Sequence, residues 1–599
     1  MAYTRPWADL DRTLAVASGN DFARKVRPLL RLIWPTIVET PPMQKWDTDG
    51  IDYVAWVDEG SFPCVIQCKG FEVQMLGDPQ LAQIRKSVSK FRKSGHHCDE
   101  YVLVHNRDGR DREFHSKATA LVTSLVTAGC AVRARVLDRQ SLRTEVYAAL
   151  RQHVEEAARR ATTERADRRR RLFDLAPVDP LMSVPATTGT IRLKAFAPLQ
   201  VDLDTPTRLN PVEFILQGSA RRWTLMEGMF GAGKTTATLA AASSANRVVI
   251  YVPCADIPET GFLSLRQLLE SAVSELDVFG AAQDENDRVV VQELAGAMIV
   301  ALLSGVGKDS RYLLVFDGLD ENRRFGTADG LTRLVNQLEP IECPVVLATR
   351  SEHLSALFGN FSSALGGLSH KFGANPTLDL LRLDPWTIED AAEAVERASR
   401  RAPAPAVAHL LELQAMLLDG SYAAIVGDLP TNPLMLQFLI EDVAAGEFGR
   451  VTTATLIGRW LRKKFWRDTE HRKSLLGDVL DTVVVVERTA LLMERTALAM
   501  TASAGEHIEL VEHIDSDAVQ ALASVLFPLE ADPIVGVAVN TALVPVDRRR
   551  EAVVQLTFAL RVFHEYFLAA ALRRAALQAT AYPQGVQILW RELDTADGV

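Results

Sequence analysis

A glycine-rich segment in the middle of the chain carries the residue types that phosphate binding needs. Residues 228–236 read GMFGAGKTT, between an apolar run and an alanine-rich stretch. In a strand–loop–helix unit of this kind, backbone N–H groups surround phosphate oxygens, the lysine reaches the outer phosphates and a hydroxyl holds Mg²⁺. With Thr235 as a metal ligand, the predicted nucleoside triphosphate site consists of Gly228, Gly231, Gly233, Lys234, Thr235 and Thr236.

Carboxylates follow a second apolar run farther along the chain. Residues 311–316 read RYLLVF, and Asp317-Gly-Leu-Asp320-Glu321 comes directly after them. A carboxylate at the C-terminal end of a buried parallel strand is placed to hold Mg²⁺ beside a nucleotide, so Asp317 is a predicted metal ligand. A further carboxylate can orient an attacking water, which makes Asp320 and Glu321 the predicted catalytic pair. The predicted reaction is hydrolysis of a nucleoside triphosphate.

A second set of polar residues lies near the N-terminus. Asp52 begins one strand-like run, and Gln67-Cys68-Lys69 ends the next. Asp52 and Gln67 offer oxygen atoms to a hard divalent ion such as Mg²⁺ or Mn²⁺. Residues two apart in a strand share a face, so Lys69 would lie beside the metal and its water. Asp52, Gln67 and Lys69 are therefore predicted catalytic residues for cleavage of a phosphodiester.

The pattern of apolar residues predicts an α/β protein in several segments. Strand-like and helical runs alternate over residues 1–148, which predicts an α/β domain. Residues 149–204 are expected to form a charged helical linker. Regular alternation over residues 205–385 predicts a parallel sheet with helices on both faces. The remainder is expected to be helical, with a helical domain over 386–448 and a winged-helix-like and helical region over 449–599.

These segments come with specific expected elements. The N-terminal strands are expected at residues 53–57, 64–67, 101–105 and 131–137, with helices at 21–33, 80–92 and 117–128. The central strands are expected near residue 223 and at 248–252, 312–316, 345–348 and 378–383, and amphipathic helices at 386–401 and 406–419. In the linker, the arginine run at 168–171 could contact a nucleic acid backbone, but a solvated helix face is favoured.

Composition limits the class of protein. The chain has 599 residues, a hydrophobic content of 48% and a formal net charge of −10, which excludes a globally basic nucleic-acid binder but not a local basic groove. No apolar run is long enough to span a bilayer and the first residues lack a signal-peptide pattern, so we expect a cytoplasmic protein without a membrane partner. A zinc site fits no usual ligand spacing, so free thiols are preferred for the candidate residues, which are Cys64, Cys68, His96, His97 and Cys98.

The central and C-terminal motifs resemble those of NACHT proteins in the STAND class of signalling ATPases. The resemblance covers roughly residues 205–575 and rests on the phosphate loop, DGLDE at 317–321, Ala348-Thr349-Arg350, Thr431-Asn432-Pro433-Leu434 and FHEYF at 563–567. It implies that ATP is the nucleotide, that Arg350 senses the γ-phosphate and that Pro433 packs on the adenine. The family often has a β-phosphate-binding histidine at the position of Leu560, so His564 is not assigned as a nucleotide ligand.

The N-terminal segment looks like the Mrr-like subgroup of PD-(D/E)xK nucleases, which has the restriction-endonuclease-like fold. This resemblance rests on Gly50-Ile51-Asp52 followed by Gln67-Cys68-Lys69, where glutamine replaces the usual second carboxylate. It implies double-stranded DNA as the substrate. The acidic residue that the family often has in its first helix is either displaced to Asp21 or missing. In the next helix, Gln83 and Lys86 are expected on a solvated face.

The two resemblances together imply an antiviral defence protein. A phage-derived component of unknown identity would promote ATP binding and self-association into an oligomer, and the clustered nuclease domains would then cut DNA. Two alternatives stay open. One is a modification-dependent restriction complex in which the ATPase is a DNA-translocating motor. The other is a signalling scaffold whose N-terminal domain binds DNA without cutting it.

Overall fold

The computed structural model separates the chain into two compact units. The smaller unit contains residues 1–158 and 275–305, and the larger contains residues 159–274 and 306–599. The structure describes residues 12–39, 49–55, 62–72, 77–108, 112–173, 183–194, 200–217, 223–244, 247–254, 257, 264–270, 285–304, 311–326, 328–351, 364–372, 377–422, 426–447, 451–471, 481–504, 507–511, 513–546 and 555–581.

The smaller unit is built around a mixed five-stranded sheet in the order β1-β2-β3-β4-β5. The first three strands pair antiparallel and the last two join them in parallel, through helical crossovers. Buried aliphatic and aromatic side chains from the sheet and from α4 and α5 form its core. The strands are β1 (Ile37–Glu39), β2 (Tyr53–Ala55), β3 (Phe62–Lys69), β4 (Cys98–His105) and β5 (Ala131–Leu137). The helices are α2 (Gly19–Ile33), α4 (Asp78–Ser94), α5 (Arg112–Thr127) and α10 (Glu285–Ser304), which contacts α2.

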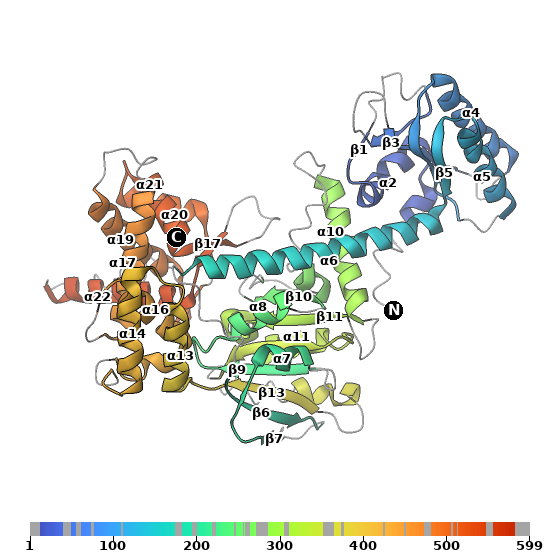
Figure 1. The fold of residues 1–599 in the computed structure, drawn as a ribbon. Coiled ribbons are helices and arrows are strands. Elements are labelled where there is room, and N and C mark those ends of the chain that lie inside the picture. The colour runs from blue at the N-terminus through green and yellow to red at the C-terminus, as the bar shows by residue number, and fades with distance from the viewer. Residues whose placement is uncertain are drawn as a thin grey trace. The chain divides into compact units, whose positions relative to one another are not determined.

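A single helix, α6 (Arg139–Arg171), follows the last strand of this sheet. Its 33 residues correspond to about 50 Å at the usual rise of ~1.5 Å per residue. Figure 1 shows it as one unbroken helix. Its residues up to Ala158 belong to the smaller unit and those from Arg159 onward to the larger.

The larger unit contains a sheet whose central strands are parallel. Strands β10 (Val248–Pro253), β11 (Tyr312–Asp317), β12 (Val345–Arg350), β9 (Trp223–Gly228) and β13 (Thr377–Leu383) lie side by side in that order (Figure 1). Strand β9 lies between β12 and β13, and the chain leaves it for β10, the first strand of this order. In open α/β sheets, ligands bind at the carboxyl ends of the strands where the strand order changes direction in this way. The register places Arg350 beside Gly228 and Asp317 beside Pro253, so all these strands end at one edge.

One edge of this sheet differs from the prediction. Strands β6 (Val184–Arg192), β7 (Gln200–Leu203) and β8 (Thr207–Leu209) add to it antiparallel, with β6 paired to β13. Residues 184–192 and 200–203 therefore belong to the sheet rather than to a helical linker, although the proposed domain boundaries stay a prediction. The helices and turns that complete this part are α7 (Pro211–Gln217), α8 (Lys234–Ser244), α9 (Leu265–Glu270), η4 (Leu319–Glu321), η5 (Arg323–Gly326), α11 (Ala328–Gln337) and η6 (Ser369–Phe372).

Helices dominate the chain after β13, as the sequence predicts. They pack into one core with the sheet, and Figure 1 shows them gathered beside it in orange and red. The helices are α13 (Ile388–Ser399), α14 (Ala404–Leu418), η7 (Leu429–Thr431), α16 (Pro433–Ala444), α17 (Thr453–His471), α19 (Thr482–Ala499), α20 (Ser516–Leu526), α21 (Ala531–Thr541) and α22 (Arg561–Ala581). The strands are β14 (Thr501–Ala504), β15 (His507–Leu510), β16 (Ile514–Asp515), β17 (Leu543–Val546) and β18 (Gln555–Phe558).

The predicted elements agree with the structure in type and position. All four N-terminal strands and all five central strands are present, with ends that shift by a few residues, and residues 56–57 of the first expected strand lie outside the described residues. The protein is a mixed α/β chain with a parallel sheet. No helix among the described residues is long and apolar enough to span a bilayer.

Candidate functional site

The glycine-rich loop connects the buried strand β9 to helix α8, as the sequence predicts. Gly231 has a φ of +77° and Gly233 a φ of +98°, values that residues with a Cβ atom rarely adopt. A Cβ atom on Gly231 would lie 2.4 Å from Oδ1 of Asn432, so there is also no space for one. Both glycines are therefore required by the shape of the loop.

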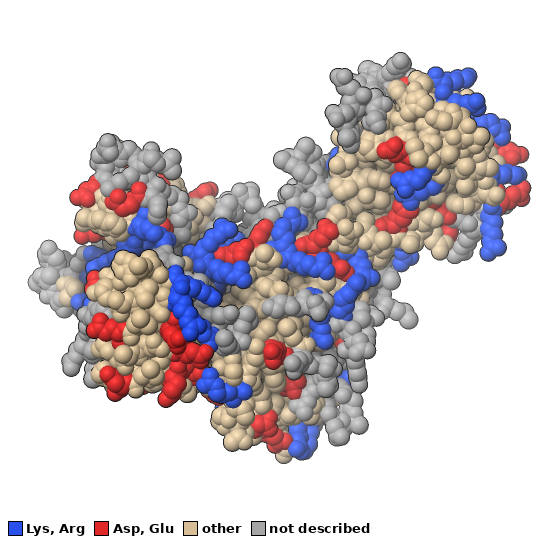
Figure 2. Space-filling view, viewed as in Figure 1, with Lys and Arg blue, Asp and Glu red and all other residues tan. Residues whose placement is uncertain are grey.

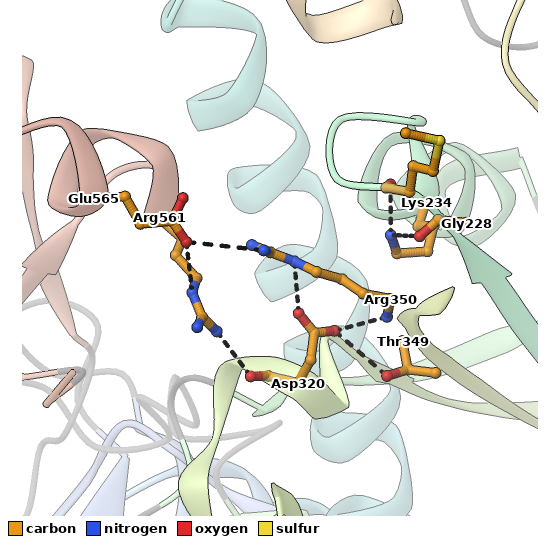
Figure 3. A network of polar contacts seen from close by, with 8 residues as sticks. Gly228, Lys234, Asp320, Thr349, Arg350, Arg561 and Glu565 are labelled. Atoms are coloured by element: carbon orange, nitrogen blue, oxygen red, sulfur yellow. Dashed lines mark hydrogen bonds and ion pairs between the residues drawn. The ribbon is translucent and has the colours of Figure 1, made fainter. Parts of the chain in front are cut away.

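Lys234 lies folded against its own loop. Its Nζ donates hydrogen bonds to the carbonyl oxygens of Gly228 at 2.7 Å and Met229 at 3.1 Å (Figure 3). Burial lowers the pKa of this ammonium, and the nearby carboxylates of Asp320 and Asp317 oppose the shift. An ammonium that is held by carbonyl oxygens at the base of the loop is placed to exchange them for phosphate oxygens.

The end of β11 and the start of α8 form a candidate magnesium site. The Tyr251 hydroxyl donates to Oδ2 of Asp317 at 2.6 Å. Burial raises the pKa of Asp317, and this hydrogen bond and the neighbouring Thr235 side chain partly offset the rise. Its Oδ1 atom is buried and has no hydrogen-bond partner among the described residues. A buried carboxylate oxygen beside a threonine hydroxyl fits a hard cation, and Thr235 and Asp317 would hold Mg²⁺ here.

Arg350 at the end of β12 is bound to Asp320. Because β12 lies between the strands that carry the loop and Asp317, its last residue enters the site. Nε of Arg350 is 2.8 Å from Oδ2 of Asp320, and its backbone N–H donates to Oδ1 at 3.0 Å. The guanidinium also lies over the ring of Phe230, 4.7 Å from its centroid. Asp320 is almost fully buried and serves as the charge partner of Arg350.

The first turn of α22 completes this arrangement, which we name the Arg350 network (Asp320, Arg350, Arg561 and Glu565). Oε1 of Glu565 is 3.8 Å from Nη1 of Arg350 and accepts a hydrogen bond from Nε of Arg561 at 3.2 Å. Arg561 also donates to the backbone oxygen of Asp320 at 2.9 Å. Figure 3 shows Arg350 between Asp320 and Glu565. The C-terminal helix is thus tied to the end of β12 and to the turn after β11.

His564 is a packed residue of α22, and the sequence does not predict it to be a nucleotide ligand. It is buried, its Nε2 is 3.3 Å from the backbone oxygen of Ala497, and its ring stacks on Phe558 at 4.9 Å. Burial lowers the pKa of this imidazole to about 4, so it is neutral near pH 7. It also lines the cavity at the end of the sheet.

Pro433 and Asn432 join α16 to the glycine-rich loop. Pro433 is the first residue of α16 and lines the cavity, where the resemblance places an adenine contact. Asn432 caps the helix by accepting from the N–H groups of Leu434 and Met435, and its Nδ2 donates to the Phe230 oxygen at 2.6 Å. Asn432 is therefore a residue of this site for which the sequence predicts no role.

These elements surround one cavity of about 340 Å³ in the larger unit, within the range of small-molecule sites. The predicted residues that line it are Gly231, Gly233, Lys234, Thr235, Thr236, Asp317, Asp320, Glu321, Arg350 and Pro433. Gly228 lies at the loop's start and contacts Lys234 instead. Glu321 folds over Gly318, whose φ of +73° and crowded Cβ position require glycine.

Three arginines of α6 also line this cavity, namely Arg165, Arg168 and Arg169. The preference for a solvated helix face holds for Arg168, Arg170 and Arg171, which are exposed, although Arg168 also lines the cavity. Arg169 is half-buried against the cavity and departs from that preference. The structure adds Tyr251, Arg561 and Glu565 to the predicted site as well. Helices α6 and α22 are far from the glycine-rich loop in the sequence, so the sequence alone does not predict that they contact the cavity.

In the smaller unit, the structure brings Asp52 and Gln67 together. Nε2 of Gln67 donates to Oδ2 of Asp52, which also accepts from the backbone N–H of Cys68 at 2.6 Å. Oε1 of Gln67 is buried and makes no hydrogen bond to a described residue. A carboxylate and an amide oxygen on one side of β3 supply oxygen donors for a hard cation, provided that the amide turns its oxygen toward Asp52.

The other candidate residues for this site lie on β3, α2 and α4. Lys69 ends β3, opposite His105 on β4. Asp21 binds Arg24 and Lys25 of its own helix at 2.9 and 2.8 Å, so its carboxylate is occupied there. Gln83 and Lys86 are exposed on α4, as expected. All six cysteines are buried and free, and no described group of three or more His, Cys, Asp or Glu side chains is placed to hold a metal ion.

No protein-family model and no curated protein matches this chain. Solved structures do match. A STAND protein with a tetratricopeptide repeat sensor from Pyrococcus horikoshii is 13% identical, covers 64% of this chain and has a TM-score of 0.28. The chain spans 47% of that protein's length. The ORC1 protein of Aeropyrum pernix, solved in complex with DNA, is 18% identical, with 61% of this chain and 92% of that chain covered and a TM-score of 0.24.

Proposed function

We propose that the chain is an ATP-dependent switch of the STAND type. The observation that carries the proposal is the Arg350 network, because the arginine that lines the phosphate cavity is held by Asp320 and by Glu565 of the C-terminal helix. A γ-phosphate is a stronger partner for a guanidinium than a carboxylate 3.8 Å away. Binding of ATP would therefore draw Arg350 from Glu565 and loosen α22, whereas ADP lacks the group that competes.

Hydrolysis would return the switch to its starting state. Thr235 and Asp317 would hold Mg²⁺, which screens the charge of the phosphates when bound. Lys234 would leave the loop carbonyls to contact the outer phosphates, and Glu321 would orient the attacking water. Asp320 forms an ion pair with Arg350 in this structure. Asp320 could therefore take up its proposed catalytic role only after Arg350 has moved away. Pro433 would contact the base.

The proposed output is DNA cleavage by the smaller unit, in antiviral defence. A phage-derived component would favour the ATP-bound form, the chains would assemble, and clustered N-terminal domains would cut double-stranded DNA in the cytoplasm. Asp52 and Gln67 would hold Mg²⁺ or Mn²⁺ and Lys69 would stabilise the charge that develops on the phosphate. The motif resemblance and the contact between Asp52 and Gln67 support this output.

One observation favours a second candidate for the smaller unit. The Gln67 amide presents its nitrogen, not its oxygen, to Asp52. A site that keeps this orientation binds no metal through Gln67, and the domain would then bind DNA without cutting it. The proposed cutter needs the amide to turn when the metal binds.

Hydrolysis by the purified full chain, with and without long duplex DNA, tests the switch. The expected result is slow MgATP hydrolysis that duplex DNA does not accelerate and that is lost in Lys234→Ala. Strong stimulation by any long duplex would instead support a translocating motor and overturn the proposal. Incubation with plasmid and Mg²⁺ or Mn²⁺ in the same experiment separates the cutting domain from the scaffold.

A further inference from the structure

The basic end of α6 forms part of the wall of the nucleotide cavity. Arg165, Arg168 and Arg169 are three and four residues apart, so they share one face of the helix. All three line the same cavity as Lys234 and Asp317 within the larger unit. In Figure 3 the long pale teal helix behind the Arg350 network is α6.

The two half-buried arginines lie close to the predicted magnesium carboxylate. The Arg165 guanidinium is over the ring of Tyr251, 5.8 Å from its centroid, and the Tyr251 hydroxyl binds Asp317. The charge of Arg169 favours the ionised form of Asp317. No described residue forms a hydrogen bond or an ion pair with the side chain of Arg168 or Arg169. These side chains therefore have donors to offer to an anion in the cavity.

The charge of the cavity wall points to a polyanion. Of the described residues that line it, six are cationic and three are carboxylates, so positive charge exceeds negative by three. The cationic residues are Arg165, Arg168, Arg169, Lys234, Arg350 and Arg561. Nucleoside triphosphates carry the opposite excess, and arginine forms paired hydrogen bonds with phosphate oxygens.

Helix stabilisation alone does not explain this placement. Cations near a helix C-terminus interact favourably with its dipole, whichever side they face. Arg170, bound to Asp167 at 2.9 Å, and the exposed Arg171 meet that description. Figure 2 shows basic and acidic side chains along the course of α6, as expected for a solvated helix. Arg165, Arg168 and Arg169 differ because they line a cavity that holds the phosphate loop.

We infer that Arg165, Arg168 and Arg169 bind the phosphates of the nucleotide. This inference rests on the proposed nucleotide site and extends it to a helix that precedes the P-loop domain in the chain. A nucleotide held by these side chains fixes the last turns of α6. Helix α6 is one continuous helix whose residues up to Ala158 belong to the smaller unit, while its last turns, in the larger unit, contribute side chains to the proposed phosphate site.

Titration of the purified full chain with MgATP tests the inference. The triple variant Arg165→Gln/Arg168→Gln/Arg169→Gln is expected to raise the Kd for ATP by about tenfold or more, as loss of charge-assisted hydrogen bonds predicts. The matched control Arg170→Gln/Arg171→Gln removes two cations from the same helix end and is expected to leave the Kd within about twofold, since neither lines the cavity. Hydrogen exchange of residues 163–171 should slow when MgATP binds to the wild type but not to the triple variant.

The outcomes separate this inference from the proposed function. If the wild type binds no ATP, the nucleotide site itself fails. If the wild type binds ATP and the triple variant binds it equally well, the inference is overturned and the switch stands. Should the triple variant fail to fold, Arg168→Gln takes its place, because Arg168 is exposed and its truncation leaves the core intact. This single variant must weaken ATP binding by about threefold, since one phosphate contact is lost, and an unchanged Kd would overturn the inference.

Discussion

The two polar sites of this protein differ in how far their charges are already arranged for a ligand. In the nucleotide site, residues from several elements converge on one cavity, with two left-handed glycines shaping the loop. In the Asp52–Gln67 site, the amide nitrogen of Gln67 donates to Asp52, and Lys69 lies at the end of the strand. The lining of the first site carries the cationic side chains that an anion needs, whereas the second must rearrange to bind a cation. A motif that fixes the backbone conformation therefore holds its functional groups in position for a ligand better than a motif that supplies only side chains.

The largest effect is expected from a substitution that disrupts the nucleotide site and leaves the N-terminal site intact. Lys234→Ala removes the loop's only cationic side chain, and we expect the Kd for MgATP to rise by at least about a hundredfold, an order-of-magnitude expectation for a buried charge–phosphate contact. Titration with a fluorescent ATP analogue measures it. Plasmid binding by the smaller unit should persist in this variant. Unchanged ATP affinity would remove the basis of the nucleotide assignment.

The second prediction breaks the N-terminal site and leaves the nucleotide site intact. Lys69→Ala and Asp52→Ala should each abolish plasmid cleavage in the presence of millimolar-scale Mg²⁺ or Mn²⁺, an order-of-magnitude expectation for a weak oxygen site. Both variants should bind ATP as the wild type does. Gln67→Glu should retain cleavage, because a carboxylate has no donor to turn toward Asp52. The exposed Lys86→Ala serves as the control.

Absence of cleavage by activated wild-type protein under all divalent ions would favour the non-cutting domain. Cleavage that survives Asp52→Ala would move the metal site elsewhere.

The third prediction sharpens the role of backbone shape. Gly231→Ala places a Cβ atom against Asn432 in a left-handed conformation that costs roughly 1–2 kcal/mol for an alanine. We expect weaker ATP binding by about tenfold, from that cost converted at ~1.4 kcal/mol per decade. The double variant Gly231→Ala/Asn432→Ala relieves the clash but not the φ strain, so part of the loss should remain. Full recovery in the double variant would show that only the clash matters.

How much of this could be predicted differs between the elements. The loop at 228–236 and the carboxylates after β11 were predictable because strand, loop and helix follow one another within a short segment. Strands β6 and β7 were not predicted, and β7 has only four residues, all of them exposed at the sheet edge. The contact of Arg168 and Arg169 with the cavity was not predicted, because the sequence of a polar helix carries no sign of which face meets a cavity. The contact of Glu565 with Arg350 depends on tertiary packing between distant segments.

The smallest expected effect is on the pH dependence of folding stability, to which one buried histidine in each unit contributes. Burial lowers the pKa of both His105 and His564 to about 4, from an ordinary value of 6.5. The unfolded chain binds a proton more readily, so each contributes stability that is present above pH 6.5 and is lost as the pH falls toward 4. The expected slope is at most about 1.4 kcal/mol per pH unit for each histidine.

His564→Gln keeps a donor for the Ala497 oxygen and removes one of these titrations. The fall in thermal unfolding temperature between pH 7 and pH 5 should be smaller in this variant than in the wild type. The same fall in both proteins would show that His564 is not the titrating group.

The central claim is that the γ-phosphate and Glu565 compete for Arg350. The most direct test is the ratio of the Kd for ADP to the Kd for a non-hydrolysable ATP analogue, measured by calorimetry on the full chain. Glu565→Gln removes the competitor's charge and should raise this ratio by a few-fold, whereas Arg350→Ala should bring it close to one. The control Glu393→Gln breaks an exposed pair with Arg397 and should leave the ratio unchanged. Equal ratios in the wild type, Glu565→Gln and Arg350→Ala would contradict the account.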